Sequence, residues 1–187
     1  MTRRTAAVVT GVMLLAAIGV GVGGAALLGL FDDPTVQRSD AAAASPDRPE
    51  VMETTFEHFD GRIVRLSDWA GTPMVVNFWA SWCPPCVAEM SAAFEPVHQQ
   101  LGDQVAFVGL NLQDDPDDAF GIVRQTGVTY DLGRDPVGEL FRDFGGIGMP
   151  TTVFVDESGI VIDTHTGALS QAQLEQLIAD SFGIGPQ

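Results

Sequence analysis

The sequence predicts an α/β domain built on a central mixed β-sheet with helices on both of its faces. The first observation is the apolar run 74–80, Met-Val-Val-Asn-Phe-Trp-Ala, which is typical of a fully buried strand. The second is the helical pattern directly after it, in which apolar residues recur at spacings of three and four at Val87, Met90, Phe94 and Val97. The third is the order of the elements, because strands alternate with helices early and a hairpin follows near the end.

The N-terminal segment 1–31 differs from the rest of the chain. Arg3 and Arg4 precede a stretch, 6–31, that carries no charged residue. A membrane-spanning helix needs about 20 apolar residues, so 1–31 is predicted to be a signal-anchor and transmembrane helix. A cleaved secretory signal is the alternative. In both cases the two arginines stay inside. The rest of the chain is then extracytoplasmic, either as a single-pass protein of the cell membrane or as a secreted one.

The remaining chain divides into a linker and a folded domain. Residues 32–50 are rich in Asp, Pro, Ser and Ala, which predicts a flexible linker. Residues 51–187 are predicted to be the folded domain. The whole chain has 25 acidic residues and 9 basic ones, all of them arginine, and a formal net charge of −16. Such an acidic protein is not expected to bind nucleic acid.

Turn and capping signals divide the first part of the domain into elements. Asp60-Gly61, which lies among apolar residues, predicts a β-hairpin. The helix that contains the cysteines is expected to end near Gln100, and the run 105–110 predicts a second buried strand. Asp117 or Asp118 is expected to cap a helix that ends at Gln125. Residues 128–132 are predicted to form a short strand.

The last part of the domain is predicted in the same way. Residues 136–144 predict a short helix that ends at Gly145-Gly146. Residues 151–156 and 160–165 predict the two strands of a hairpin. Ser170 is expected to cap a final amphipathic helix, whose apolar face carries Leu174, Leu177, Ile178 and Phe182.

Cys83 and Cys86 are the only cysteines of the chain, and they lie where the central strand leads into a helix. Cys83 is predicted near the N-cap and Pro84 at the first helical position, where proline is favoured. The positive end of the helix dipole stabilises a thiolate at Cys83 and lowers its pKa. Cys86, one turn further along, can close a small disulfide ring with Cys83. The pair therefore predicts thiol–disulfide exchange.

Two other interpretations of the cysteine pair are weaker. A structural disulfide across so short a loop adds little stability through chain entropy. A zinc site usually needs two further Cys or His ligands, and His58, His98 and His165 show no ligand spacing. The sequence therefore predicts neither a metal site nor a cofactor.

The stretch from Asn77 to Cys86, Asn-Phe-Trp-Ala-Ser-Trp-Cys-Pro-Pro-Cys, resembles the active-site region of the thioredoxin superfamily. The chain is similar in particular to the membrane-anchored TlpA/ResA/DsbE-like thiol–disulfide oxidoreductases. Gly148-Met149-Pro150-Thr151-Thr152 matches the superfamily's cis-proline loop. The segment 154–159 matches the hairpin that follows the loop. This resemblance, which covers about 51–182, implies a thioredoxin-like fold.

The resemblance implies a role for each residue of these motifs. Cys83 is expected to be the exposed nucleophile and Cys86 the buried resolving thiol. Pro150 is expected to be a cis proline that faces the cysteines. Met149 would offer backbone groups to an extended substrate segment, with a purely structural core methionine as the alternative. Trp82 is expected to pack beside the thiols.

Three further positions are compared with the family pattern. Glu89 matches an acidic residue near the active site of this subfamily, where it would tune a thiol or transfer a proton. A solvated position on the helix is the alternative. Asn77 stands where cytosolic thioredoxins have a buried acid, so that residue's proton-relay role is expected to be absent. Ser91 stands where most relatives have a helix-kinking proline, which predicts a straighter helix.

The expected function is the reduction of protein disulfides outside the cytoplasm. The resemblance implies substrates such as the haem-site cysteines of apocytochrome c or the cysteines of copper sites. Because no reducing pool is expected outside the cytoplasm, a membrane electron donor is expected to re-reduce the Cys83–Cys86 pair. One alternative is an oxidase that forms disulfides in exported proteins. Another is a non-catalytic copper carrier, because thiolates suit Cu(I) and His165 lies on a late strand that could approach the site.

Overall fold

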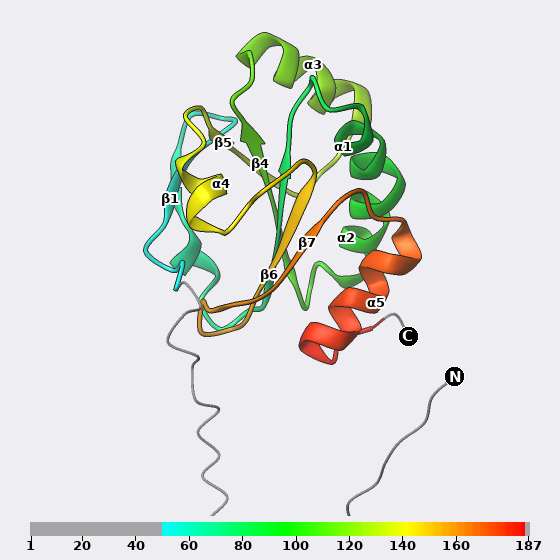
Figure 1. The fold of residues 1–187 in the computed structure, drawn as a ribbon. Helices are drawn as coiled ribbons and strands as arrows, with labels where there is room; N and C mark the ends of the chain where they lie inside the picture. The colour runs from blue at the N-terminus through cyan, green and yellow to red at the C-terminus, as the bar shows by residue number, and fades with distance from the viewer. Residues whose placement is uncertain (1–49, 186–187) are drawn as a thin grey trace, which may run out of the picture. The chain divides into compact units, whose positions relative to one another are not determined.

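The structure is a computed structural model and describes residues 50–185 (Figure 1). The predicted signal-anchor and nearly all of the predicted linker lie outside these residues. Within 50–185, no helix has the length and apolar character that crossing a membrane requires. Val51 and Met52 are buried at the start of the described chain, and the backbone N–H of Val51 donates to the Gly159 carbonyl.

A seven-stranded mixed sheet forms the centre of the domain, in the order β2-β1-β5-β4-β3-β6-β7. Strands β3, β4 and β5 are parallel to one another, and the other pairings are antiparallel. All residues of β3 and β4 are buried, as the two apolar runs predicted. The strands are β1 (Thr55–His58), β2 (Ile63–Arg65), β3 (Met74–Trp79), β4 (Ala106–Leu112), β5 (Asp131–Asp135), β6 (Thr151–Val155) and β7 (Val161–Thr166).

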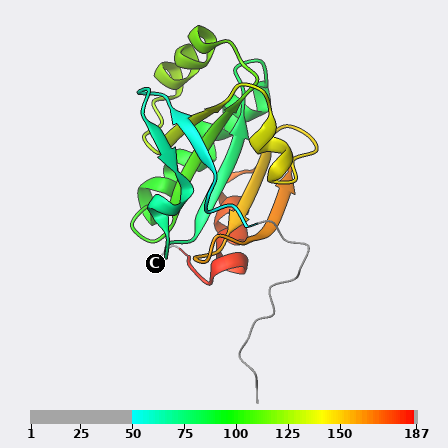
Figure 2. The same cartoon turned by 90° about the vertical axis from the view of Figure 1, so that its left-hand side faces the viewer.

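Helices cover both faces of this sheet (Figures 1 and 2). Val75 and Trp79 of β3 belong to a core that includes Phe94 and Leu174 from the helices on one face. The alternate residues of β3 point to the second core, which helix α4 and the short helix η1 cover. The helices are η1 (Leu66–Trp69), α1 (Pro84–Glu89), η2 (Met90–Phe94), α2 (Glu95–Leu101), α3 (Pro116–Thr126), α4 (Glu139–Asp143) and α5 (Gln171–Phe182).

The helix after the cysteines departs from the straight helix that Ser91 predicted. The segment η2 between α1 and α2 is a π-helix, in which the N–H of Glu95 donates to the Met90 carbonyl five residues earlier. Pro96 follows at the start of α2. A proline inside a helix has no N–H to donate and its ring crowds the preceding turn. The helix is therefore irregular despite Ser91, and the irregular segment lies directly before the turn that contains Pro96.

Three predicted boundaries were also wrong by a few residues. Asp115, rather than Asp117 or Asp118, caps α3, and its carboxylate accepts hydrogen bonds from both of their N–H groups. Strand β5 begins at Asp131 instead of residue 128, because it pairs with Val108 of β4 from that residue onward. Helix α4 begins at Glu139, after Gly138 in a left-handed conformation.

The cap of α5 was predicted correctly and can be tested. Ser170 and Gln173 form a reciprocal capping box at the start of this helix, and Leu174 and Ile178 of the same helix are fully buried. Ser170→Ala is expected to lower the free energy of unfolding by about 1 kcal/mol. Urea denaturation measures the loss, with Ser91→Ala at an exposed helical position as the control. Equal stability of the two variants would contradict the assigned role of the cap.

Candidate active site

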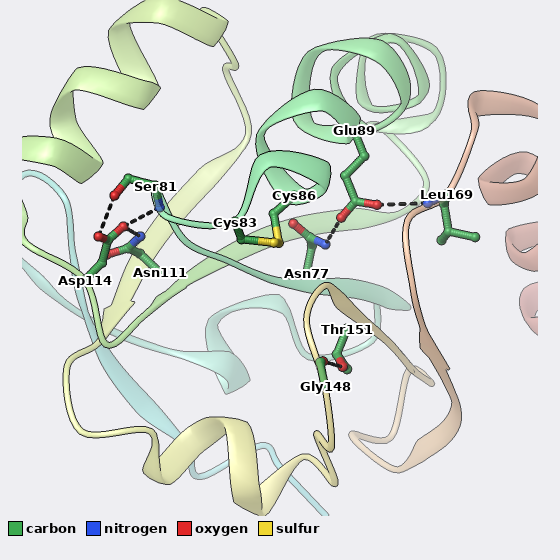
Figure 3. Close-up of a disulfide and its surroundings, with 10 residues drawn as sticks. All are labelled: Asn77, Ser81, Cys83, Cys86, Glu89, Asn111, Asp114, Gly148, Thr151 and Leu169. Atoms are coloured by element: carbon green, nitrogen blue, oxygen red, sulfur yellow. Dashed lines mark hydrogen bonds between the residues drawn. A yellow bond between two sulfur atoms is a disulfide. The ribbon is translucent and has the colours of Figure 1, made fainter.

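Cys83 and Cys86 form a disulfide at the start of α1 (Figure 3). Cys83 is the N-cap residue and Pro84 is the first helical residue, as the sequence predicted. Cys86 is fully buried, whereas Cys83 retains 5% of its surface exposed. The order of exposure agrees with an outer nucleophile and an inner resolving thiol. Cys83 is nevertheless less exposed in the disulfide form than the resemblance implied.

The position of Cys83 determines its chemistry once the disulfide is reduced. Its carbonyl accepts the N–H of Val87, so the helix begins directly at this residue. Pro84 and Pro85 at the first two helical positions have no N–H to donate, so it is the positive end of the helix dipole that favours a negative charge on the Cys83 sulfur. Cys86 lies inside the helix without this exposure. The two sulfurs are therefore chemically unequal, and the rate of thiol–disulfide exchange depends on the pKa and the access of the attacking sulfur.

Glu89 places a carboxyl group in the interior, one turn after Cys86. Only 3% of the residue is exposed, so the alternative of a solvated position on the helix is wrong. The side-chain nitrogen of Asn77 donates to Oε1 at 3.0 Å, and the backbone N–H of Leu169 donates to Oε2 at 2.9 Å. Burial raises the pKa of Glu89 to about 7, although both hydrogen bonds oppose the shift. This carboxyl can gain or lose a proton near neutral pH.

The site has a buried acid although residue 77 is an asparagine, because Glu89 supplies the carboxyl group. The Asn77 side chain on β3 holds the carboxyl that α1 supplies at Glu89 (Figure 3). Helical spacing in the sequence pointed to the inward position of Glu89, which lies three residues after Cys86 and four before Ala93 and so shares their helix face. In the structure both of these neighbours are buried. No such signal existed for Leu169, which reaches Glu89 from 80 residues further along the chain.

The loop before β6 lies across the disulfide from helix α1 in Figure 3. The peptide between Met149 and Pro150 is cis, as the resemblance implied. The hydroxyl of Thr151 donates to the Gly148 carbonyl, and the N–H of Gly167 donates to the Pro150 carbonyl at 2.9 Å. Met149 is partly buried and packs against both hydrophobic cores. Its side chain thus contributes to the packing of both cores.

Trp82 lies at the surface next to Cys83, with 55% of the residue exposed. Its ring N–H donates to the Gln113 carbonyl at 3.2 Å, so the ring is held against the loop that follows β4. The preceding residue, Ser81, is hydrogen-bonded to Asp114 of the same loop. Sequence reasoning missed Gln113 and Asp114, because only the pairing of β3 with β4 brings them to the cysteine loop.

The residues proposed for a copper site are not gathered into a metal centre. Within the part of the chain that the structure describes, no group of three or more His, Cys, Asp or Glu side chains is placed to hold a metal ion. His165 lies on β7, directly opposite Thr152 of β6.

The mixed sheet, the two unequal cysteines at a helix start and the cis-proline loop together define a thioredoxin-like thiol–disulfide oxidoreductase. Comparison with known families agrees with this class, because the Redoxin family model matches residues 49–178. The chain belongs to the redoxin family. It is 33% identical over 163 residues to the thiol:disulfide interchange protein DsbE homolog of Paracoccus denitrificans. The aligned region covers 84% of this chain and 86% of that protein.

Two other relatives extend the comparison. The thiol-disulfide oxidoreductase ResA of Bacillus thuringiensis is 28% identical over 134 residues, which is 71% of this chain and 75% of that protein. A solved structure of a secreted disulfide oxidoreductase of Mycobacterium tuberculosis, described as homologous to DsbE of E. coli, superimposes with a TM-score of 0.62. It is 25% identical and covers 70% of this chain and 98% of its own.

The buried carboxyl predicts how stability depends on pH. The pKa of Glu89 is about 7 in the folded protein against an ordinary value of 4.5. Between these two values the folded state holds a proton that the unfolded state has released, so stability falls as pH rises. Glu89→Gln is expected to remove this loss. The free energy of unfolding of the oxidised wild type should fall by about 3 kcal/mol relative to the variant between pH 4.5 and pH 7.5.

Urea denaturation of both oxidised proteins across this pH range measures the difference. Taking the difference between them cancels the titration of the other acidic groups, which both proteins share. Parallel pH profiles would contradict a raised pKa at Glu89.

Proposed function

We propose that this thiol–disulfide oxidoreductase works as a reductase of protein disulfides outside the cytoplasm. The observation that carries the direction is the buried carboxyl of Glu89, one helical turn from Cys86 and less than two turns from Cys83. A negative charge near the sulfurs destabilises their thiolates. A strong oxidant such as DsbA depends on the opposite, a stabilised reduced form. The charged form of Glu89 thus opposes the stabilisation that the helix start gives to the Cys83 thiolate, and it favours giving electrons away.

The reaction proceeds in two exchanges. The Cys83 thiolate attacks one sulfur of the substrate disulfide and forms a mixed disulfide, while the other substrate sulfur leaves as a thiolate and takes a proton. Cys86 then loses its proton and attacks the Cys83 sulfur. The second substrate sulfur leaves as a thiolate and is protonated. Two electrons have passed to the substrate, and Cys83 and Cys86 are joined in a disulfide.

Glu89 is the group best placed to take the proton of Cys86. Cys86 is fully buried, so water cannot reach its thiol easily. A base works best when its pKa is near the working pH, and the pKa of about 7 at Glu89 meets this condition. In the disulfide form, Asn77 and Leu169 hold the carboxyl in place through two hydrogen bonds.

The location and the partners follow from the same proposal. The segment 1–31 would anchor the protein in the membrane, and 32–50 would carry the domain 51–187 on the extracytoplasmic side. A membrane electron donor with a dithiol would reduce the Cys83–Cys86 disulfide after each cycle, because no reducing pool is expected there. Protein disulfides are the substrate class, with the cysteine pairs of apocytochrome c or of copper sites as specific candidates. Met149, Pro150 and Trp82 are the residues that would contact the substrate.

Cysteine variants of the full-length protein test the proposal. Cys86→Ser is expected to accumulate a mixed disulfide with insulin, because the attack of Cys83 proceeds while resolution fails. Cys83→Ser is expected to form no mixed disulfide, because Cys86 is buried. Both variants should lose insulin reduction almost completely, and non-reducing gels with mass spectrometry identify the trapped species. A Cys83→Ser protein that still reduced insulin would overturn the proposed roles.

A further inference from the structure

The nucleophile is presented by a tight turn at the end of β3. The N–H of Cys83 donates to the Ala80 carbonyl at 3.1 Å, so Ser81 and Trp82 are the two central residues of a β-turn. The conformation of these two residues determines where the chain places the Cys83 backbone. The contacts that hold them are therefore contacts that hold the nucleophile.

Asp114 holds the first of the two central residues. One carboxylate oxygen accepts the N–H of Ser81 at 2.6 Å, and the other accepts the Ser81 hydroxyl at 2.6 Å (Figure 3). The same carboxylate also accepts hydrogen bonds from the Asn111 side chain and from the N–H of Asp115, both at 2.9 Å. Four donors thus converge on one side chain. Asn111 itself is almost fully buried at the end of β4, so the carboxylate is anchored to the sheet.

Gln113 holds the second central residue through its carbonyl, which accepts the ring N–H of Trp82 at 3.2 Å. Gln113 has a φ of 45° and is the one non-glycine residue with a positive φ in the described part of the chain. This conformation is uncommon for such a residue, and it persists only where the surroundings hold it. They do so here through two hydrogen bonds, from its N–H to the Asp135 carbonyl at 3.0 Å and from its side chain to the Val137 carbonyl at 3.2 Å.

We propose that Asp114 is a positioning residue for Cys83, because it fixes the turn that aims the nucleophile at a substrate disulfide. This inference rests on the proposed function. Thiol–disulfide exchange places three sulfur atoms in a line, so a small displacement of the attacking sulfur slows the reaction. The Asp114 carboxylate accepts four hydrogen bonds and touches neither sulfur. It acts on the reaction through Ser81.

The neighbouring residue Asp115 provides a matched control. It carries the same charge and lies in the same loop, but its side chain accepts hydrogen bonds from Asp117 and Asp118 at the start of α3. Asp115→Ala therefore removes one negative charge and weakens this region without touching the turn. Ser81→Ala removes one of the hydrogen bonds to Asp114 and leaves the others.

The test measures kcat/KM of the full-length proteins for insulin reduction, at a temperature where circular dichroism shows each variant to be folded. Asp114→Ala is expected to lower kcat/KM by about ten- to a hundredfold. Ser81→Ala should lower it by about fivefold, as for the loss of one hydrogen bond, and Asp115→Ala should leave it within about twofold. Adding Ser81→Ala to Asp114→Ala should cause little further loss, because the two residues act through one contact.

Rates equal to wild type in both Asp114→Ala and Ser81→Ala would overturn the inference and leave the proposed function intact. An equal loss in Asp115→Ala would also overturn it, since the loss would then come from charge or from the loop as a whole. If Asp114→Ala does not fold, Ser81→Ala decides the question by itself. A lowered kcat/KM in Ser81→Ala would then support the inference, and a rate equal to wild type would overturn it. A wild-type protein that does not reduce insulin would refute the proposed function, and the inference would fail with it.

Discussion

The buried carboxyl of Glu89 is the constraint on which the arrangement of the site depends. A carboxyl group removed from water must be satisfied by donors or lose its charge. Here the donors come from two separate elements, Asn77 on the central strand and Leu169 in the segment that leads into α5. The helix that carries Cys86 is thereby joined to the sheet and to the C-terminal part of the fold. The same burial raises the pKa of the group into the range where it can exchange a proton.

The sheet explains why residues from distant parts of the sequence meet at the cysteines. Strands β3, β4 and β5 are parallel, so their carboxyl ends lie at one edge. The cysteine turn follows β3, Gln113 and Asp114 follow β4, and Val137 follows β5. Ligand sites of open α/β sheets form at this edge, because the loops converge there. Strand β6 runs in the opposite direction beside β3, which brings the cis-proline loop to the same edge.

The sequence predicted the features that depend on local patterns. The buried strand, the helix that starts at Pro84, the Ser170 cap and the closing hairpin each have a short-range signal, and the structure contains all of them. The irregular helix was not predicted, because Ser91 replaces the proline expected there and Pro96 lies five residues further along the same helix. The inward position of Glu89 was available from helical spacing. Leu169, Gln113 and Asp114 reach the site only through tertiary pairing, which single-sequence patterns do not reveal.

The reduction potential of the Cys83–Cys86 pair tests the central claim most directly. Equilibration of the full-length protein with dithiothreitol buffers at pH 7, read out by thiol labelling, gives this value. A reductase whose thiolates lie near a buried carboxyl is expected to have a potential near or below about −220 mV. A potential near about −120 mV would contradict the account, because it would require a strongly stabilised reduced form and would make the protein an oxidant.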